Sequence, residues 1–466
     1  MREIDPLRLV LEHAGQFLTS LDRLPVDARL TAASTRALLS SLPEEGREPV
    51  EVISSLIAAA QHGIVRNTGG RFFGWVMGGA LPSAMAADWL TSLWDQNAAT
   101  AIAAPAACAV EEVTAGWLKE LLGLPATASY AFTTGCQMAH ATCLAAARNG
   151  VLDKVGWDVE RRGLAGAPAV RVITGSHRHG SVDRTLRLLG LGLDSLVVVQ
   201  EDEDGKLAPE RLEPLLKEPC EPTILVLNAG DLNIGACDPF ETLIPMAHAS
   251  GCWVHIDGAF GLWLRASRTR RQLVAGLEQA DSWATDAHKW LNVPYDSGIA
   301  FVANPVPHSA AMSMTASYVE KSSQARDPID FTPEWSRRAR ALPVYAALQE
   351  LGRNGLAHLI DRTCDLTLEL ATRLGALPDA ELLRLPLMNQ ALVRFTDPCP
   401  GADAAAHDRR TMEMVRRIRE SGVAYFTDTV WRGCRAMRIS LVNWRTSAGD
   451  IDEIVASVAA LLEADR

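Results

Sequence analysis

The chain contains few lysines, and its acidic residues outnumber its basic residues. The 466 residues carry a formal net charge of −11 and give a sequence pI near 5.5. Nucleic-acid-binding proteins usually show a basic patch, so this balance gives no support to a nucleic-acid partner. Six residues are lysine, namely Lys119, Lys154, Lys206, Lys217, Lys289 and Lys321. Any chemistry that requires a reactive amine therefore has a short list of candidates.

Paired cysteines are missing as well. The nine cysteines are odd in number, form no CxxC pair and mostly stand among apolar residues. This pattern argues against a disulfide or structural zinc framework and favours reduced, buried thiols. We therefore expect a reducing compartment, the cytoplasm, and no metal ion.

No stretch has the pattern of a membrane span or a signal peptide. The alanine-rich segment 80–110 is interrupted by Asp88 and Asp95, and the N-terminal sequence MREIDPLRLVLEHAG carries charges from its start. A membrane helix needs about 20 predominantly apolar residues, and a signal peptide needs an apolar core. We therefore expect no membrane partner.

Helix and strand patterns alternate through the middle of the chain. Apolar spacing predicts helices over 6–22, 27–42 and 50–61. From about residue 110, helical stretches alternate with short apolar runs such as SYAFTT, AVRVITG, TILVLNAG and CWVHIDG. Near-continuous apolar strands between helices indicate an α/β fold with a mostly parallel, helix-covered sheet. The predicted organisation is an N-terminal helical arm (1–65), a large α/β domain (66–340) and a smaller C-terminal α+β domain (341–466).

Two segments place polar groups at the carboxyl ends of strands, where ligands gather in open α/β sheets. In AFTTGCQMAH, Thr134, Gly135 and Cys136 lead into a helix. That arrangement suits a phosphate group, but it also suits an ordinary helix N-cap, and it lacks the spacing of a Walker loop. In ITGSHRHGSVDR, His177 and His179 could stack on a ring, titrate or bind a metal, although no third ligand with zinc spacing follows.

A carboxylate and a lysine stand in two further segments. Asp257 follows the apolar strand of CWVHIDGAFGLW, where it needs a cation or hydrogen-bond donors, either in a binding site or in a structural salt bridge. In SWATDAHKWLNV, Lys289 has an acid only at Asp286 and otherwise adjoins His288 and Trp290. We expect desolvation to disfavour its ammonium form and to free the amine for attack on a carbonyl.

The four segments together match the needs of one cofactor. Pyridoxal 5′-phosphate requires a phosphate site, a group that stacks on its ring, an acid that holds the pyridinium proton and a lysine that forms a Schiff base. Each feature is ambiguous alone. In this order along the chain, they predict an enzyme that uses pyridoxal phosphate.

The same motifs resemble those of the pyridoxal-phosphate-dependent group II amino-acid decarboxylases, which include the aromatic amino-acid, glutamate and 2,4-diaminobutyrate enzymes. HIDGAFG resembles the family motif HVDAA(F/Y/W)G, AHKWL resembles its HKW segment, and the separation of 32 residues between Asp257 and Lys289 also agrees. HGSVDR, TTGCQMAH and MRISLVNWRTS are similar to other family segments. The resemblance runs from about residue 70 to the C-terminus and implies the fold type I of aspartate aminotransferase.

The resemblance implies roles for individual residues. Lys289 would form the Schiff base, Asp257 would pair with the pyridine nitrogen and His179 would stack on the ring. The phosphate would bind at the turn after the first strand, and Asn228 would lie near the ring hydroxyl. The implied cofactor-binding residues are Thr134, Gly135, Cys136, His179, Asn228, Asp257, Ala259, His288 and Lys289.

The resemblance also implies a homodimer with active sites at the subunit interface, and a mobile catalytic loop at 317–335. Trp75 and Met77, in RFFGWVMGG, would line the substrate pocket together with Phe331 of the loop. In the aromatic decarboxylases a loop tyrosine protonates the carbanion that remains after CO2 departs, whereas the alignment places Phe331 at that position. Tyr318 and His179 are other possible proton donors.

Two reaction outcomes are therefore open for a small-molecule amino-acid substrate. The first is decarboxylation of an L-amino acid to the corresponding amine and CO2. The alternative, which Phe331 motivates, is oxidative deamination to an aldehyde or another lyase reaction on the same scaffold. A non-catalytic regulator has little support, because no helix-turn-helix is recognisable.

Overall fold

The computed structural model describes residues 3–217, 221–314, 316–317, 320, 322 and 325–464. The chain divides into two compact units. The smaller unit comprises Met1–Met77, Leu366–Leu385 and Ala391–Arg466, and the larger unit comprises Gly78–Asp365 and Pro386–Gln390. The predicted boundaries after residues 65 and 340 stay predictions. None of the helices in the described ranges combines the length and apolar character of a membrane span.

A seven-stranded sheet forms the centre of the larger unit. Its strand order is β1-β7-β6-β5-β4-β2-β3. The strands β3, β2, β4, β5 and β6 pair in parallel, whereas β7 is antiparallel to both β1 and β6. The bounds are β1 Ser129–Thr133, β2 Arg171–Gly175, β3 Leu196–Val199, β4 Thr223–Asn228, β5 Trp253–Asp257, β6 Ser282–Asp286 and β7 Gly298–Val302. The predicted mostly parallel α/β sheet is confirmed.

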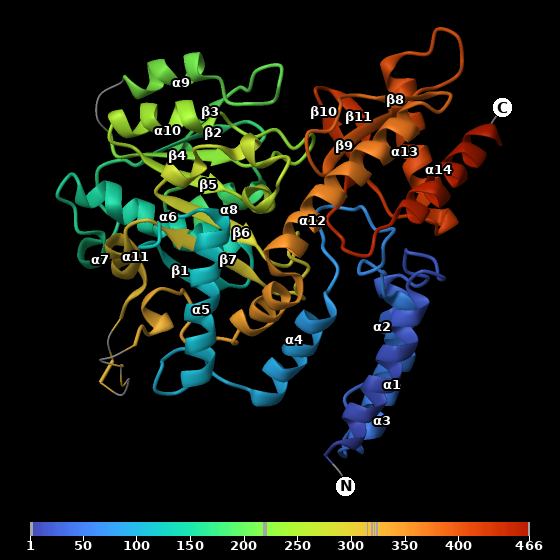
Figure 1. Ribbon diagram of the computed structural model, residues 1–466, viewed down its shortest axis with the longest axis horizontal. Helices are drawn as coiled ribbons and strands as arrows, with labels where there is room; N and C mark the ends of the chain where they lie inside the picture. The colour runs from blue at the N-terminus through green and yellow to red at the C-terminus, as the bar shows by residue number, and fades with distance from the viewer. Residues whose placement is uncertain are drawn as a thin grey trace. The chain divides into compact units, whose positions relative to one another are not determined.

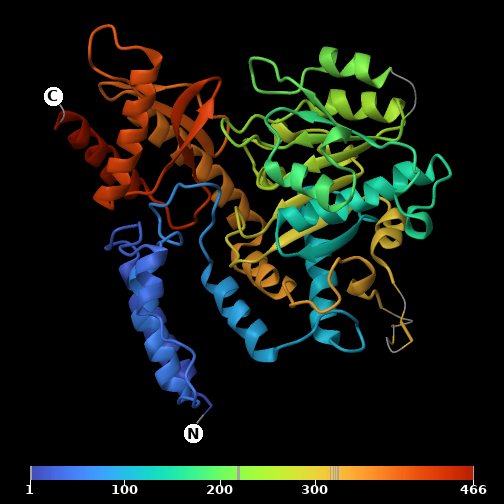
Figure 2. The ribbon, with the colours of Figure 1, turned by 180° about the vertical axis from the view of Figure 1, so that it is seen from behind.

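Helices cover this sheet. Helix α6, which is largely buried, contacts β1, β4, β5, β6 and β7 (Figure 1). Its small alanine, cysteine and threonine side chains permit that close approach. Helices α9 and α10 lie side by side in both views (Figures 1 and 2). The bounds are α4 Pro82–Trp94, α5 Pro105–Leu122, α6 Cys136–Asp153, α7 Val159–Arg162, α8 Gly180–Leu188, α9 Pro209–Leu216, α10 Phe240–Ala249 and α11 Pro305–Met312.

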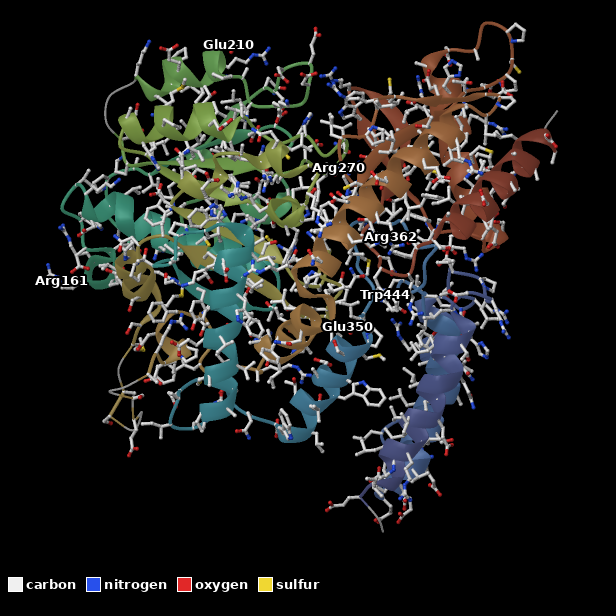
Figure 3. All side chains as sticks on the ribbon, viewed as in Figure 1. Arg161, Glu210, Arg270, Glu350, Arg362 and Trp444 are labelled. Atoms are coloured by element: carbon white, nitrogen blue, oxygen red, sulfur yellow. The ribbon has the colours of Figure 1, made fainter. Side chains whose placement is uncertain are left out.

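The long helix α12 (Ala341–Gly375) contributes to both units. It is kinked at Gly352, whose φ of 58° is readily adopted only by a residue without a side chain. Glu350, just before the kink and labelled in Figure 3, accepts a hydrogen bond from the Ser83 N–H at 2.9 Å. That bond satisfies a free N–H in the first turn of α4.

The smaller unit combines a four-stranded sheet with helices. Its strand order is β10-β11-β9-β8, and its core includes the buried side chains of Phe73, Phe395, Phe426 and Ile439. The strands are β8 Ala380–Leu382, β9 Gln390–Phe395, β10 Thr427–Trp431 and β11 Cys434–Ser440. The helices are α1 Asp5–Ser20, α2 Ala32–Leu38, α3 Pro49–Ala60, α13 Ala404–Ser421 and α14 Ala448–Glu463.

The second predicted helix, 27–42, is wrong in extent. Helix α2 begins only at Ala32, because the Thr31 side chain accepts the Ser34 N–H and caps the helix there. It ends at Leu38, where the next residue is already extended. The prediction rested on apolar spacing, which gives no information about a hydrogen bond from a polar side chain.

Candidate active site

Strand register brings two sets of residues together at one edge of the large sheet. In the first set, Asn228 of β4 is paired with Asp257 of β5, which is paired in turn with Ala284 of β6. In the second, Gly298 of β7 is paired with both Thr133 of β1 and Asp286 of β6. The ends of β1, β4, β5 and β6 therefore meet around one site.

The turn that follows β1 forms one wall of this site. A side chain on Gly298 would overlap the backbone of Gly135, so glycine is required for the two chains to approach. A side chain on Gly135 would meet His288 at 3.3 Å and Asp286 at 3.6 Å. The half-buried Thr134 precedes this glycine. The turn thus leaves a confined space bounded by β6 and the start of α6.

Asp286 connects the turn to the lysine. Its Oδ1 accepts the Cys136 N–H at 2.5 Å, and its Oδ2 lies 3.0 Å from Lys289 Nζ. Burial lowers the pKa of Lys289, but the charge of Asp286, with smaller effects of Cys136 and Asp257, outweighs it and leaves this pKa above its ordinary value. The expectation that desolvation frees the amine is therefore wrong for this structure, because a buried carboxylate stabilises the ammonium form.

His288 lies beside the same carboxylate. Its Nε2 is 3.5 Å from Asp286 Oδ1, its Nδ1 accepts the Ser297 N–H at 3.2 Å and its ring centroid lies 4.3 Å from that of Tyr295. Burial lowers the pKa of His288. Because Nδ1 is an acceptor, the proton of the neutral ring is assigned to Nε2.

Asp257 is held as a buried carboxylate. Its Oδ1 accepts the Ala259 N–H at 3.1 Å, and its Oδ2 lies 3.4 Å from His140 Nε2. Burial raises the pKa of Asp257, but the electrostatic effect and hydrogen bond of His140, with smaller effects of His179 and Lys289, hold it well below the usual range. The group is ionised at neutral pH and can bind a cationic N–H.

His179 stands at the N-terminus of α8. Its Nδ1 accepts the Ser181 N–H at 3.2 Å and lies 2.7 Å from Ser181 Oγ. Burial lowers its pKa, partly opposed by the charge of Asp257. The ring is therefore neutral, a form that suits stacking on a second ring.

Other predicted site residues have contacts elsewhere. The Asn228 N–H donates to Asp238 Oδ2 at 2.7 Å, and the ring of Phe331 packs against Arg326 and His308. Trp75 and Met77 belong to the smaller unit, where both pack near Phe72 and Tyr425. Tyr318 lies outside the described residues. The site roles predicted for these residues stay predictions.

The sequence prediction missed two histidines and a serine. His140 lies one helical turn after Cys136, and His255 lies two residues before Asp257 on the same face of β5, so helix and strand periodicity contained the signal. Ser297 Oγ is buried without a hydrogen-bond partner among the described residues. Nothing in its local sequence distinguishes it from other loop serines.

A cluster at the base of the site has a spacing that a metal ion could also bridge. One ligand atom each of Cys136, His140 and Asp257 lies within 4.8 Å of the others. Hydrogen bonds among these groups account for the spacing without an ion, since His140 Nε2 lies 3.4 Å from both Cys136 Sγ and Asp257 Oδ2. The absence of a metal stays a prediction.

Comparison with known proteins places the chain in a family. Residues 35–396 match the model of the pyridoxal-dependent decarboxylase conserved domain. The chain is 28% identical over 464 residues to the aromatic-L-amino-acid decarboxylase of Bacillus atrophaeus, which covers 98% of this chain and 93% of the relative. It is also 28% identical over 383 residues to the L-2,4-diaminobutyrate decarboxylase of Rhizobium meliloti, covering 80% of this chain and 74% of the relative.

A solved structure agrees with the fold. The Oryza sativa TDC with PLP and tryptamine superposes with a TM-score of 0.91 at 19% identity and covers 98% of this chain and 97% of its own. The predicted fold type I is confirmed. The chain belongs to the pyridoxal-dependent decarboxylase family, and it is a pyridoxal-phosphate-dependent carboxy-lyase that converts an L-amino acid to an amine and CO2.

Proposed function

We propose that the site around Lys289 carries out this decarboxylation, with Lys289 as the covalent anchor of the cofactor and Asp257 as the partner of its ring nitrogen. The observation that carries the proposal is the arrangement of one half-buried lysine, one ionised carboxylate and one neutral histidine at the ends of adjoining strands. Lys289 is part of a motif at the end of β6, and His179 lies at the start of α8.

The residues present fit pyridoxal phosphate. The glycine at 135 leaves space that a side chain would fill, and the buried Ser297 hydroxyl, which has no hydrogen-bond partner among the described residues, precedes the Gly298 that packs on Gly135. Thr134 would join them at the phosphate, as would Cys136 once its N–H exchanges Asp286 Oδ1 for a phosphate oxygen, and His179 and Ala259 would face the ring. When bound, the cofactor supplies an electron sink for the bond that breaks at the substrate Cα.

The protein's own groups would then hold or move protons at three atoms. Asp257 would keep a proton on the ring nitrogen, because an ionised, buried carboxylate stabilises an adjacent cation. Lys289 Nζ lies 3.0 Å from Asp286 Oδ2, so Asp286 would hold its ammonium proton. His179, with its proton on Nε2, is a second group that could deliver a proton to the substrate Cα.

A prediction follows for Asp286→Asn. We expect this change to lower the pKa of Lys289, because it removes the charge that stabilises the ammonium ion. The neutral amine attacks an aldehyde, so covalent attachment of added pyridoxal phosphate would be roughly tenfold faster at neutral pH, and its pH profile would move to lower pH. Stopped-flow absorbance of the cofactor-free protein measures both quantities.

The matched control for this prediction is Asp281→Asn. Asp281 precedes the opposite end of β6, where it lies 2.9 Å from His248 and accepts the Val254 N–H. We expect its pH profile to coincide with that of the unmodified protein. An unchanged profile in Asp286→Asn would show that Asp286 does not control the protonation of Lys289.

The comparisons do not favour the aldehyde-forming alternative, because the curated relatives are decarboxylases. The Phe331 ring also has a structural explanation, since the Arg326 guanidinium lies 3.9 Å from its centroid and His308 packs edge-on. The test is a panel of L-amino acids assayed with and without oxygen. Amine and CO2 in equal amounts without oxygen uptake support the proposal, whereas aldehyde, ammonia and peroxide would overturn it.

We also propose a cytoplasmic homodimer whose active sites lie at the subunit interface, with Trp75 and Met77 lining the substrate pocket. The dimer is supported by apolar side chains that α1 and α3 leave in solvent, since Leu7, Leu11 and Leu56 are each more than half exposed. Such surfaces mark interaction sites.

The cytoplasmic location is supported by the cysteines, because all eight in the described ranges are free thiols.

A further inference from the structure

A continuous line of buried polar groups begins behind Asp257 and runs away from the cofactor side of the site. His140 Nε2 lies 3.4 Å from Asp257 Oδ2, and His140 Nδ1 is 2.8 Å from His255 Nε2. His255 Nδ1 is 2.9 Å from Ser282 Oγ, which also accepts the Trp253 indole N–H at 2.9 Å. His140, His255 and Ser282 have no exposed surface, and Trp253 is 5% exposed.

The two ends of this line each have a fixed hydrogen-bonding role. The Trp253 indole can only donate, and an ionised carboxylate such as Asp257 can only accept. If Ser282 accepts from Trp253 and donates to His255, then His255 Nε2–H donates to His140. His140 Nε2–H is left to point at Asp257. In this order every buried N–H and O–H in the line has an acceptor.

The opposite order is less favourable. In that order His140 Nδ1–H would donate to His255 and His255 would donate to Ser282, so His140 Nε2 would present no hydrogen to Asp257 and the Ser282 hydroxyl hydrogen would have no acceptor in the line. An unsatisfied buried donor costs about 1–3 kcal/mol. Burial and the neighbouring His140 also hold the pKa of His255 well below its ordinary value, which agrees with a neutral ring.

We propose that Trp253, Ser282, His255 and His140 form a hydrogen-bond relay that orients the Asp257 carboxylate for the ring nitrogen of the cofactor. His140 and His255 are positioning residues in this relay, because they act on the cofactor through Asp257. The inference rests on the role proposed for Asp257. It goes beyond that role by assigning a function to four residues to which the family resemblance gave none.

Geometry around His140 supports a directing role. Cys136 Sγ, on the preceding turn of α6, lies 3.4 Å from the same Nε2, and burial holds the pKa of this thiol well above its ordinary value. A protonated thiol is a weak acceptor, so the stronger acceptor for the His140 proton is Asp257. His179, which precedes α8, also acts electrostatically on Asp257, although its Nδ1 accepts the Ser181 N–H.

The test compares two ligands of the cofactor-free protein, without turnover. One ligand is pyridoxal phosphate, and the other is its carbocyclic analogue with C–H in place of the ring nitrogen. We expect His140→Leu to weaken pyridoxal phosphate by about tenfold or more, since a hydrogen bond to a charged group is lost, and the analogue by less than about threefold. Dissociation constants come from quenching of tryptophan fluorescence.

Conservative variants separate positioning from packing. In His140→Gln the amide nitrogen can still donate to Asp257, so we expect this variant to recover most of the discrimination between the two ligands. The control is Cys143→Ala, on the same helix, where a fully buried thiol that bonds only strand carbonyls is removed. We expect the control to affect both ligands equally.

Three results would overturn the relay. Equal weakening of both ligands by His140→Leu would leave the histidines with a structural role alone. A stoichiometric metal ion in the purified protein that His140→Leu loses would mean that the cluster is a metal site. A wild-type chain that binds both ligands equally would overturn the role of Asp257 together with the relay, whereas amine and CO2 production, assayed separately, would still stand.

Discussion

Lys289→Ala is expected to lose covalent attachment of pyridoxal phosphate and to lower amine production by more than about a thousandfold. The physical reason is that the variant has no amine at the site with which to bind the cofactor aldehyde or to move a proton near the substrate Cα. Among the described residues, Asp286 is the ionic partner of Nζ at 3.0 Å, and Nζ lies 5.8 Å from the centre of the Phe260 ring. Borohydride reduction followed by peptide mapping identifies the modified lysine.

Lys154→Ala is the matched control for this prediction. Lys154 belongs to the same unit, but its Nζ donates to the Gly251 carbonyl at 3.1 Å, away from the strand ends that form the site. We expect this variant to retain covalent cofactor and amine production. Borohydride labelling of a lysine other than Lys289, or a visible cofactor band that persists in Lys289→Ala, would contradict the assignment.

Glu111→Gln is expected to destabilise the larger unit by about 3 kcal/mol. Glu111 and Arg337 form an ion pair at 2.8 Å, with side chains that are 1% and 0% exposed. The Arg337 guanidinium also donates to the carbonyls of Ala98 and Phe132. Removing the carboxylate leaves a buried cation without its counter-charge. The pair joins α5 to the segment that precedes α12, so we expect the substitution to destabilise both elements.

The midpoint of urea unfolding measures this loss, and Glu120→Gln is its control. Glu120 lies on the same helix, but its ion pair with Arg353 is 68% and 60% exposed. Exposed pairs contribute about 0–1 kcal/mol, so we expect a small shift in the control. Equal shifts in the two variants would show that burial does not increase the contribution of the Glu111 pair.

Fold class, family, cofactor and reaction were all predictable from the sequence. The apolar runs TILVLNAG and CWVHIDG form the parallel, fully buried strands β4 and β5, because a strand covered on both faces must be apolar along its whole length. The motifs around Asp257 and Lys289 come together because both follow strands whose ends lie at the same edge of the sheet.

The protonation of Lys289 was not predictable in the same way. Its apolar sequence neighbours suggested a neutral amine, whereas the folded chain places the Asp286 carboxylate 3.0 Å from Nζ and raises the pKa. A pKa depends on distances to charges in space, and sequence spacing alone leaves those distances undetermined. The segment 27–42 shows the same limit at the level of secondary structure, where a single side-chain hydrogen bond at Thr31 decides where the helix begins.

By itself, the sequence determined which chemical groups the protein has and on which elements they lie. The lysine, the carboxylate, the histidine and the glycine-containing turn each follow or precede a strand whose pattern is local. Only the tertiary structure decided how those groups act on one another. It put Asp286 between the turn and Lys289, and it joined His140 to His255 across a helix and a strand that are 115 residues apart. The physical reason is that hydrogen bonds and charge interactions depend on separations of a few ångströms, which arise only when distant segments pack.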